Sequence, residues 1–220
     1  MGMSMKLEAM LFDLDGTLAE TLPVCLTALR RVFRKYFGRD WSDQELLSCF
    51  GPTEEGVIKN LVPDQARECL ETYYNEYRIA HAICREPFPG IRSALDLLER
   101  NGIRLGIVTA KGRTTAEISL QYLHLDSYFE KIECGFEDKS NKPASIQKIL
   151  NDWKIPPQHI AYLGDRVSDI KSSLETGIIP LAAAWSKTAE YDRLATACPQ
   201  EIFLSVQEFI GWIRKIIPES

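Results

Sequence analysis

Hydrophobic and polar positions near the start of the chain predict one buried strand followed by a long helical region. Residues 10–12 are apolar without alternation, which is the pattern of a strand whose two faces are both covered. From residue 19 to residue 87 apolar positions recur at helical spacing, starting with a helix over 22–37 that Gly38 ends. No strand pattern interrupts residues 19–87, a length that exceeds an ordinary connection between a strand and a helix. We therefore expect an all-helical insertion there.

Three more helices are expected within this insertion. A short helix is capped by Ser42 or Asp43, another starts at the turn formed by residues 51–55, and a longer one covers residues 63–83. The longer helix carries a stripe of leucine and tyrosine, and such a stripe is typical of a packed core rather than of a binding surface.

After residue 90 the pattern changes to alternating helices and strands. Strands are predicted over residues 103–108, 132–134, 160–163 and 179–184, with helices between them and a last amphipathic helix over 206–217. Alternation of this length predicts an α/β fold with a doubly wound, Rossmann-like parallel sheet. The predicted domains are a core of residues 1–18 and 88–220 and a helical domain of residues 19–87.

Composition narrows the class of protein without naming an activity. The 220 residues are 45% hydrophobic and 26% charged, as in ordinary globular proteins. A net charge of −5 disfavours a nucleic-acid-binding surface, and no apolar run approaches the length of a membrane span. The six cysteines are spread singly, which favours free thiols in a reducing compartment. We expect a cytoplasmic protein without nucleic-acid or membrane partners.

Reactive side chains, most of them acidic, lie where the predicted strands end. Asp13 and Asp15 follow the first strand, Thr109 follows the second, and Asp165 follows a later strand with Asp169 four residues on. An Asp-Gly pair after a strand is also an ordinary turn signal, so Asp13 and Asp15 alone would not establish a site. Because parallel strands place their carboxyl ends at one edge of the sheet, however, all five side chains can converge.

Four crowded carboxylates need positive charge nearby. Each close pair repels by about 4 kcal/mol at an effective dielectric constant near 20. An all-oxygen set of ligands suits Mg²⁺, and Lys142, which precedes Pro143 at the start of a predicted helix, supplies a further cation. Together these charges would let a phosphate approach, and a carboxylate is a competent nucleophile toward phosphorus.

The ordered motifs resemble those of the haloacid dehalogenase superfamily of phosphotransferases. They are Asp13-Leu14-Asp15-Gly16-Thr17, then Thr109, then Lys142 before Pro143, then Gly164-Asp165-Arg166-Val167-Ser168-Asp169. The helical insertion resembles that family's small helical cap, and we call residues 19–87 the cap. The resemblance covers nearly the whole chain and is most specific for phosphoglycolate phosphatase-like members.

The resemblance implies a role for each motif residue. Asp13 would be the nucleophile that becomes an aspartyl phosphate, and Asp15 would be the general acid and base. Thr109, the backbone amide near Ala110, and Lys142 would bind phosphate. The magnesium ligands would be Asp13, the carbonyl of Asp15 and Asp165, with Asp169 acting through water or Lys142.

Two further segments are candidates for substrate specificity. The basic turn with Lys111 and Arg113 resembles one found in phosphoglycolate phosphatase-like members, although a solvated loop would look the same. The cap segment Gly51-Pro52-Thr53-Glu54 lies where the family's cap faces the active site, although Glu54 would equally suit a helix N-terminus.

The expected function is Mg²⁺-dependent hydrolysis of a small phosphorylated metabolite by a monomer or homodimer. Two alternatives stay open: a sugar phosphomutase of the β-phosphoglucomutase type, and a regulatory binding protein that keeps the fold without turnover. A dehalogenase is disfavoured, because the family's dehalogenases lack the acid that Asp15 provides.

Overall fold

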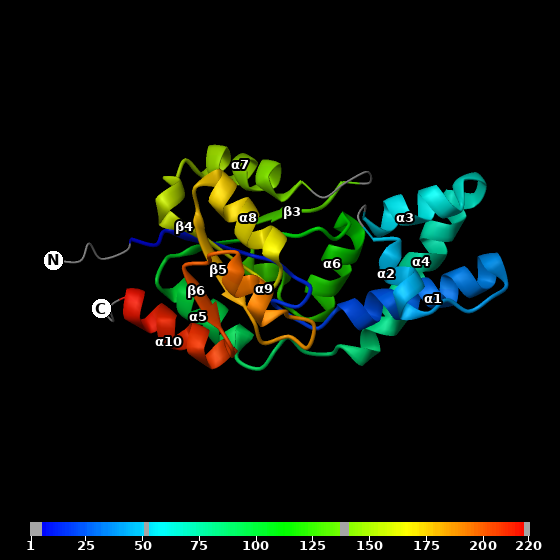
Figure 1. The fold of residues 1–220 in the computed structure, drawn as a ribbon, viewed down its shortest axis with the longest axis horizontal. Coiled ribbons are helices and arrows are strands. Elements are labelled where there is room, and N and C mark those ends of the chain that lie inside the picture. The colour runs from blue at the N-terminus through cyan, green and yellow to red at the C-terminus, as the bar shows by residue number, and fades with distance from the viewer. Residues whose placement is uncertain (1–5, 51–52, 137–140, 218–220) are drawn as a thin grey trace.

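The computed structural model describes residues 6–50, 53–136 and 141–217 of the chain. It separates into a layered α/β unit and a group of four helices, α1 to α4, that extends to one side of it (Figure 1). The described part of the chain begins and ends, at residues 6 and 217, on the side of the molecule opposite these helices (Figure 1).

The sheet has six strands, all parallel, in the order β3-β2-β1-β4-β5-β6. The first strand, β1, lies between β2 and β4 in the middle of the sheet, so Ala9 is opposite both Arg104 and Ile160. This confirms the predicted doubly wound parallel sheet. The strands are β1 Ala9–Phe12, β2 Arg104–Val108, β3 Lys131–Glu133, β4 Ile160–Gly164, β5 Ile179–Ala183 and β6 Glu201–Phe203.

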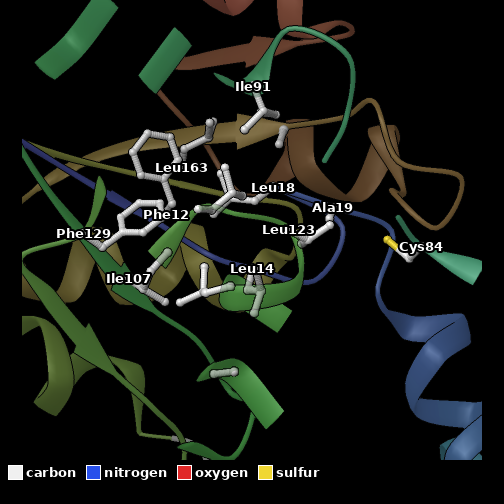
Figure 2. Packing of buried hydrophobic residues seen from close by; sticks show 14 of the residues in the cluster. Phe12, Leu14, Leu18, Ala19, Cys84, Ile91, Ile107, Leu123, Phe129 and Leu163 are labelled. Atoms are coloured by element: carbon white, nitrogen blue, oxygen red, sulfur yellow. The ribbon is translucent and has the colours of Figure 1, made fainter. Parts of the chain in front are cut away.

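Helices cover both faces of the sheet, which explains why β1 is apolar at every position. Ala9 and Leu11 pack in a cluster with residues of α7, whereas Met10 and Phe12 point into a larger cluster shared with α5 and α10. Figure 2 shows Phe12 in this larger cluster, where its ring meets Phe129 edge to face at 6.1 Å. The helices of this unit are α5 Ile91–Arg100, α6 Arg113–Tyr122, α7 Lys142–Trp153, α8 Val167–Thr176, α9 Tyr191–Thr196 and α10 Val206–Ile216.

The cap consists of helices in its described residues, as the pattern predicts. They are α1 Leu22–Phe37, α2 Asp43–Ser48, α3 Glu54–Leu61 and α4 Ala66–Ala80. Gly38 ends α1 in the left-handed conformation (φ 67°), with its N–H donated to the Arg34 carbonyl. Helix α1 packs against α4, whose Tyr73 and Tyr77 are fully buried. The tyrosine stripe is therefore a core, as expected.

Two parts of the sequence prediction differ from the structure. The helix expected over 63–83 is divided, because 3₁₀ turns at Pro63–Gln65 and His81–Ile83 flank α4 and non-helical backbone at Val62 precedes it. Strand β6 and helix α9 were not predicted at all. Both are too short to show a hydrophobic period, and β6 is an edge strand with one buried residue in three.

Other sequence expectations concern thiols and membranes. All six cysteines are free, and the side chain of Cys198 alone is exposed. Among the described residues, no helix has both the length and the apolar character that a membrane span requires.

Replacing a core aromatic residue tests the packing of the sheet against its helices. Phe209 of α10 is fully buried and lies against Phe12, Phe203 and Trp212. Phe209→Ala should lower the free energy of unfolding by about 3–5 kcal/mol, measured by urea denaturation. Phe136→Ala, at a residue 54% exposed, should change it by less than about 0.5 kcal/mol. Equal losses in the two variants would contradict this account of the core.

Candidate active site

The central strands end at a common edge and carry reactive side chains into it. Asp13 follows β1 directly, Thr109 follows β2 and Asp165 follows β4. Since β1 pairs with both β2 and β4, these three residues lie on neighbouring strands, and all three are buried. The parallel topology thus brings together residues that are between 56 and 152 positions apart in the chain.

Lys142 places a positive charge among these acids from the first turn of α7. Its Nζ lies 2.9 Å from Asp13 Oδ2, 2.5 Å from Asp169 Oδ1 and 2.9 Å from the hydroxyl oxygen of Tyr162. The Tyr162 hydroxyl donates its proton to the Val108 carbonyl at 2.6 Å, so it accepts from Lys142. Each of the three ammonium hydrogens of Lys142 therefore has an acceptor. Tyr162 was not a candidate, because a tyrosine inside an apolar strand gives no sequence signal for function.

Asp165 is the carboxylate that most clearly lacks a partner. Both of its oxygens are buried without a hydrogen-bond partner among the described residues, and only Arg166 Nε comes near, at 3.5 Å from Oδ2. Its carboxylate faces the turn at Gly16, where a Cβ atom would lie 2.2 Å from Oδ2. Gly16 also has a φ of 76°, so both the backbone conformation and the closeness of Asp165 require glycine at this position. A buried bare carboxylate is expensive unless a cation is bound.

Burial also changes the proton affinity of these acids. Removal from water raises the pKa of Asp165 to about 8, and the nearby charges of Asp13 and Asp169 add to the effect. Burial raises the pKa of Asp13 to about 6, although the Lys142 ammonium opposes the change. Positive charge beyond that of Lys142 is needed to keep Asp165 ionised at neutral pH.

The donor set fits a divalent cation. Asp13, Asp165 and Asp169 each offer a carboxylate oxygen, and these oxygens all lie within 4.8 Å of one another. Hard oxygen donors at this spacing, one of them without any other partner, suit Mg²⁺. The Asp15 side chain is not part of this group; the role expected for its carbonyl stays a prediction.

A cavity of about 320 Å³ opens over these residues. Asp15 lines it, with a side chain that is 32% exposed and a carboxylate held at both oxygens. The Thr21 hydroxyl donates to its Oδ1, and Lys111 Nζ lies 3.4 Å from its Oδ2. The lining also includes the residues Asp13, Gly16, Leu22, Phe50, Thr109, Ala110, Lys142, Pro143, Asp165, Arg166, Ser168, Ser172 and Thr188.

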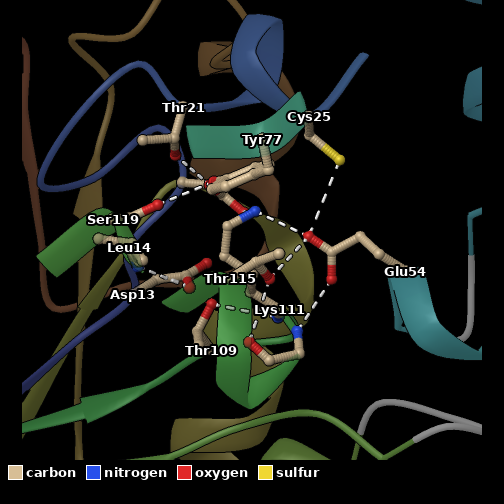
Figure 3. A network of polar contacts seen from close by, with 12 residues as sticks. Asp13, Leu14, Thr21, Cys25, Glu54, Tyr77, Thr109, Lys111, Thr115 and Ser119 are labelled. Carbon is tan, nitrogen blue, oxygen red and sulfur yellow. Dashed lines mark hydrogen bonds and ion pairs between the residues drawn. The ribbon is translucent and has the colours of Figure 1, made fainter. Parts of the chain in front are cut away.

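Glu54 and Lys111 are brought together, but against each other rather than facing the cavity. Their side chains form a buried ion pair of 2.9 Å between the cap and the core (Figure 3). Although burial alone would raise the pKa of Glu54, the Lys111 ammonium and the Gly112 N–H hold it below its usual value. Burial likewise opposes the charge of Lys111, yet Asp15 and Glu54 raise its pKa well above the usual value.

The other specificity candidates take different positions. Thr53 caps α3, accepting a hydrogen bond from the Gly56 N–H at 3.4 Å. Arg113 is exposed and contacts Glu117 and the Ile132 carbonyl, so the structure does not bring it to the cavity. Gly51 and Pro52 lie outside the described residues.

Thermal unfolding with and without Mg²⁺ tests the metal site. At a Mg²⁺ concentration of about 100 times its Kd, the wild-type protein should gain about 2.7 kcal/mol, or about 5–10 °C in Tm. Asp165→Asn should lose this gain, because it removes a charged ligand whose oxygens have no hydrogen-bond partner among the described residues. The matched control is Asp152→Asn, which changes an exposed acid paired with Lys131. An equal Mg²⁺-dependent gain in the Asp165 variant would contradict the assignment.

Comparisons with known proteins agree with this geometry. Residues 10–183 match the family model described as haloacid dehalogenase-like hydrolase. Pyrophosphatase PpaX of Halalkalibacterium halodurans is 28% identical over 177 residues, which is 79% of this chain and 82% of that protein. A haloacid dehalogenase-like hydrolase from Streptococcus pneumoniae superposes with a TM-score of 0.74 at 24% identity, covering 94% of this chain and 98% of that one.

A further solved structure extends the similarity of fold to a protein captured with a ligand. CbbY from Rhodobacter sphaeroides, in complex with phosphate, has a TM-score of 0.75 at 20% identity, with 92% of this chain and 96% of that chain covered. The family model spans well over half of the sequence. It includes the strand ends that carry Asp13, Asp15, Thr109 and Asp165 and the first turn of α7, which carries Lys142. The chain therefore belongs to the haloacid dehalogenase-like hydrolases.

Proposed function

We propose that this phosphatase hydrolyses the phosphate monoester of a small metabolite, with Mg²⁺, through a phosphorylated Asp13. The observation that carries the proposal is the arrangement of Asp13, between Lys142 and the unpartnered Asp165, at the floor of a cavity that Asp15 lines. A nucleophile, cations for phosphoryl oxygens and an acid for the leaving group are thereby provided in one place.

The first step transfers the phosphoryl group to the protein. A carboxylate oxygen of Asp13 forms a bond to phosphorus while the bond from phosphorus to the leaving oxygen breaks. Asp15 donates its proton to that leaving oxygen, which departs as an alcohol. Thr109 holds a non-bridging oxygen, and the Lys142 ammonium, hydrogen-bonded to Asp13 Oδ2, supplies positive charge beside the transferring group. Bound Mg²⁺, held by Asp13, Asp165 and Asp169, would neutralise negative charge on the transferring group.

The second step releases phosphate. Asp15, now ionised, takes a proton from a water molecule, whose oxygen attacks phosphorus and displaces the Asp13 carboxylate. Asp13 is held during both steps by the Leu14 N–H at 2.7 Å and by Lys142 at 2.9 Å. These contacts orient the carboxylate and stabilise its charge when it leaves.

The cavity limits the leaving group to a small one. Its volume of about 320 Å³ is at the lower end of ligand sites, and Leu22 and Phe50 contribute apolar surface to its wall. The relatives named pyrophosphatase make inorganic pyrophosphate one candidate substrate, beside small phosphorylated acids and sugars. Presence of both carboxylates, Asp13 and Asp15, disfavours the alternative of a binding protein without turnover.

Asparagine at the nucleophile should abolish catalysis. Asp13→Asn removes the attacking charge with little change in shape, so kcat for 4-nitrophenyl phosphate should fall by at least about 10⁴-fold. Circular dichroism should show an unchanged fold, and Asp152→Asn should keep wild-type kcat. Activity retained by the purified Asp13 variant would overturn the mechanism.

A screen of phosphorylated metabolites ranked by kcat/KM should favour small leaving groups. Pyrophosphate, phosphoglycolate or a small sugar phosphate should exceed mononucleotides by at least about 10-fold, because a cavity at the lower end of ligand-site volumes favours small leaving groups. A mononucleotide or phosphopeptide as best substrate would contradict the size argument. Transfer of the phosphoryl group to a second sugar hydroxyl faster than to water would instead identify a phosphomutase.

A further inference from the structure

The cap and the core meet at a buried ion pair whose lysine also touches the proposed acid of the reaction. We propose that Glu54 and Lys111 form a latch between the two domains that positions Asp15 for catalysis when the cap is closed. The inference rests on the proposed function, since it assigns Asp15 the acid–base role. Glu54 and Lys111 would act through Asp15 and are positioning residues.

Glu54 belongs to the cap, but its polar partners come mainly from one core segment. Its Oε1 accepts from Lys111 Nζ at 2.9 Å and from the Thr115 hydroxyl at 3.1 Å, and its Oε2 accepts from the Gly112 N–H at 2.9 Å. The Cys25 thiol adds a weak contact from α1 at 3.8 Å. Figure 3 shows the carboxylate reaching from the start of α3 onto this segment. Glu54 therefore binds the core segment of residues 111–115 through three hydrogen bonds.

Glycine at position 112 leaves room for the carboxylate of Glu55, the residue after Glu54. A Cβ atom on Gly112 would lie 1.9 Å from Glu55 Oε2 and 2.4 Å from Glu55 Oε1. The N-terminus of α3 thus rests directly on the backbone of the loop that carries Lys111. Opening of the cap would have to break these contacts together.

Lys111 connects the latch to the reaction. Its side chain is almost fully buried, and its Nζ lies 2.9 Å from Glu54, 3.4 Å from Asp15 Oδ2 and 5.0 Å from the centre of the Tyr77 ring. Tyr77 is itself tied to the core, because its hydroxyl hydrogen-bonds with Ser119 of α6 at 2.8 Å. The position of the ammonium is therefore defined by Glu54 of α3, Tyr77 of α4 and Asp15.

Asp15 consequently has both oxygens fixed from opposite sides. Thr21, at the N-terminus of α1 where the cap begins, donates to Oδ1, and Lys111 lies against Oδ2. Without Glu54 the ammonium would lose its closest partner and the carboxylate its fixed neighbour. Removal of charges from water is costly, so a buried pair adds little net stability while it fixes geometry strongly. A latch of this kind suits a cap that opens and closes in every turnover.

Leaving-group dependence distinguishes positioning of the acid from general support of the fold. Phenyl phosphate and 4-nitrophenyl phosphate are similar in shape, but phenol is the weaker acid, so its departure depends more on proton donation. Glu54→Gln should lower kcat/KM at least about 10-fold for phenyl phosphate and less than about 3-fold for 4-nitrophenyl phosphate. The control is Glu71→Gln, at an exposed cap acid paired with Arg67, which should lower neither value more than about 3-fold.

A double-mutant cycle provides the second test. Lys111→Met should reproduce the selective loss on phenyl phosphate, and Glu54→Gln combined with Lys111→Met should be no worse than the poorer single variant. Multiplicative losses would show two independent roles and overturn the latch. Equal losses on both substrates, or none in Glu54→Gln, would overturn it as well.

Hydrogen exchange separates this inference from the proposed function. The amides of residues 111–115 should exchange at least about 10-fold faster in Glu54→Ala than in the wild type, whereas Glu71→Gln should not change them. If wild-type protein hydrolyses neither aryl phosphate, the proposed function fails whatever the exchange shows. If it hydrolyses both, but Glu54→Gln affects the two substrates equally and Glu54→Ala leaves the exchange rates of residues 111–115 unchanged, the latch alone fails.

Discussion

Repulsion among carboxylates at the carboxyl edge of the sheet is the constraint on which the site depends. Asp13, Asp165 and Asp169 lie within 4.8 Å of one another, and each close pair of charges opposes folding by about 4 kcal/mol at an effective dielectric constant near 20. Lys142 offsets two of them through direct contacts, but it leaves Asp165 unpartnered. The fold thus accepts an electrostatic cost that a bound cation would relieve, and the added positive charge would then let a phosphate approach.

Parallel topology explains how a short motif becomes a site. The order β2-β1-β4 sets the carboxyl ends of three strands side by side, so each contributes one reactive residue to the same edge of the sheet. Helix α7 then brings its N-terminal lysine across this edge, and Tyr162 fixes the lysine from below. The core alone would leave such a site open to water. The cap supplies Leu22 and Phe50 to the cavity wall and, through Glu54, contacts the loop that follows Thr109.

The sequence could predict the core and the reactive residues, because both leave patterns that survive without neighbours. Apolar strands, helix periods and the ordered acidic motifs predicted the sheet, the insertion and the meeting of Asp13 with Asp165 and Lys142. What it could not predict depends on three-dimensional packing. Strand β6 exists because β5 offers it an edge, and Tyr162 matters because Lys142 happens to reach it. Likewise, Glu54 and Lys111 were candidates for contacting substrate, and only the three-dimensional structure shows that they pair with each other.

The proposed mechanism requires that Asp13 receives the phosphoryl group. Asp15→Asn protein, which keeps the nucleophile but lacks the base for the second step, should accumulate this adduct when mixed with 4-nitrophenyl phosphate and Mg²⁺. After an acid quench, mass spectrometry of the proteolytic fragments should find one phosphoryl group, on the peptide that contains Asp13 and on Asp13 itself. Release of 4-nitrophenol with no phosphorylated fragment, or with the phosphoryl group on any other residue, would contradict the account.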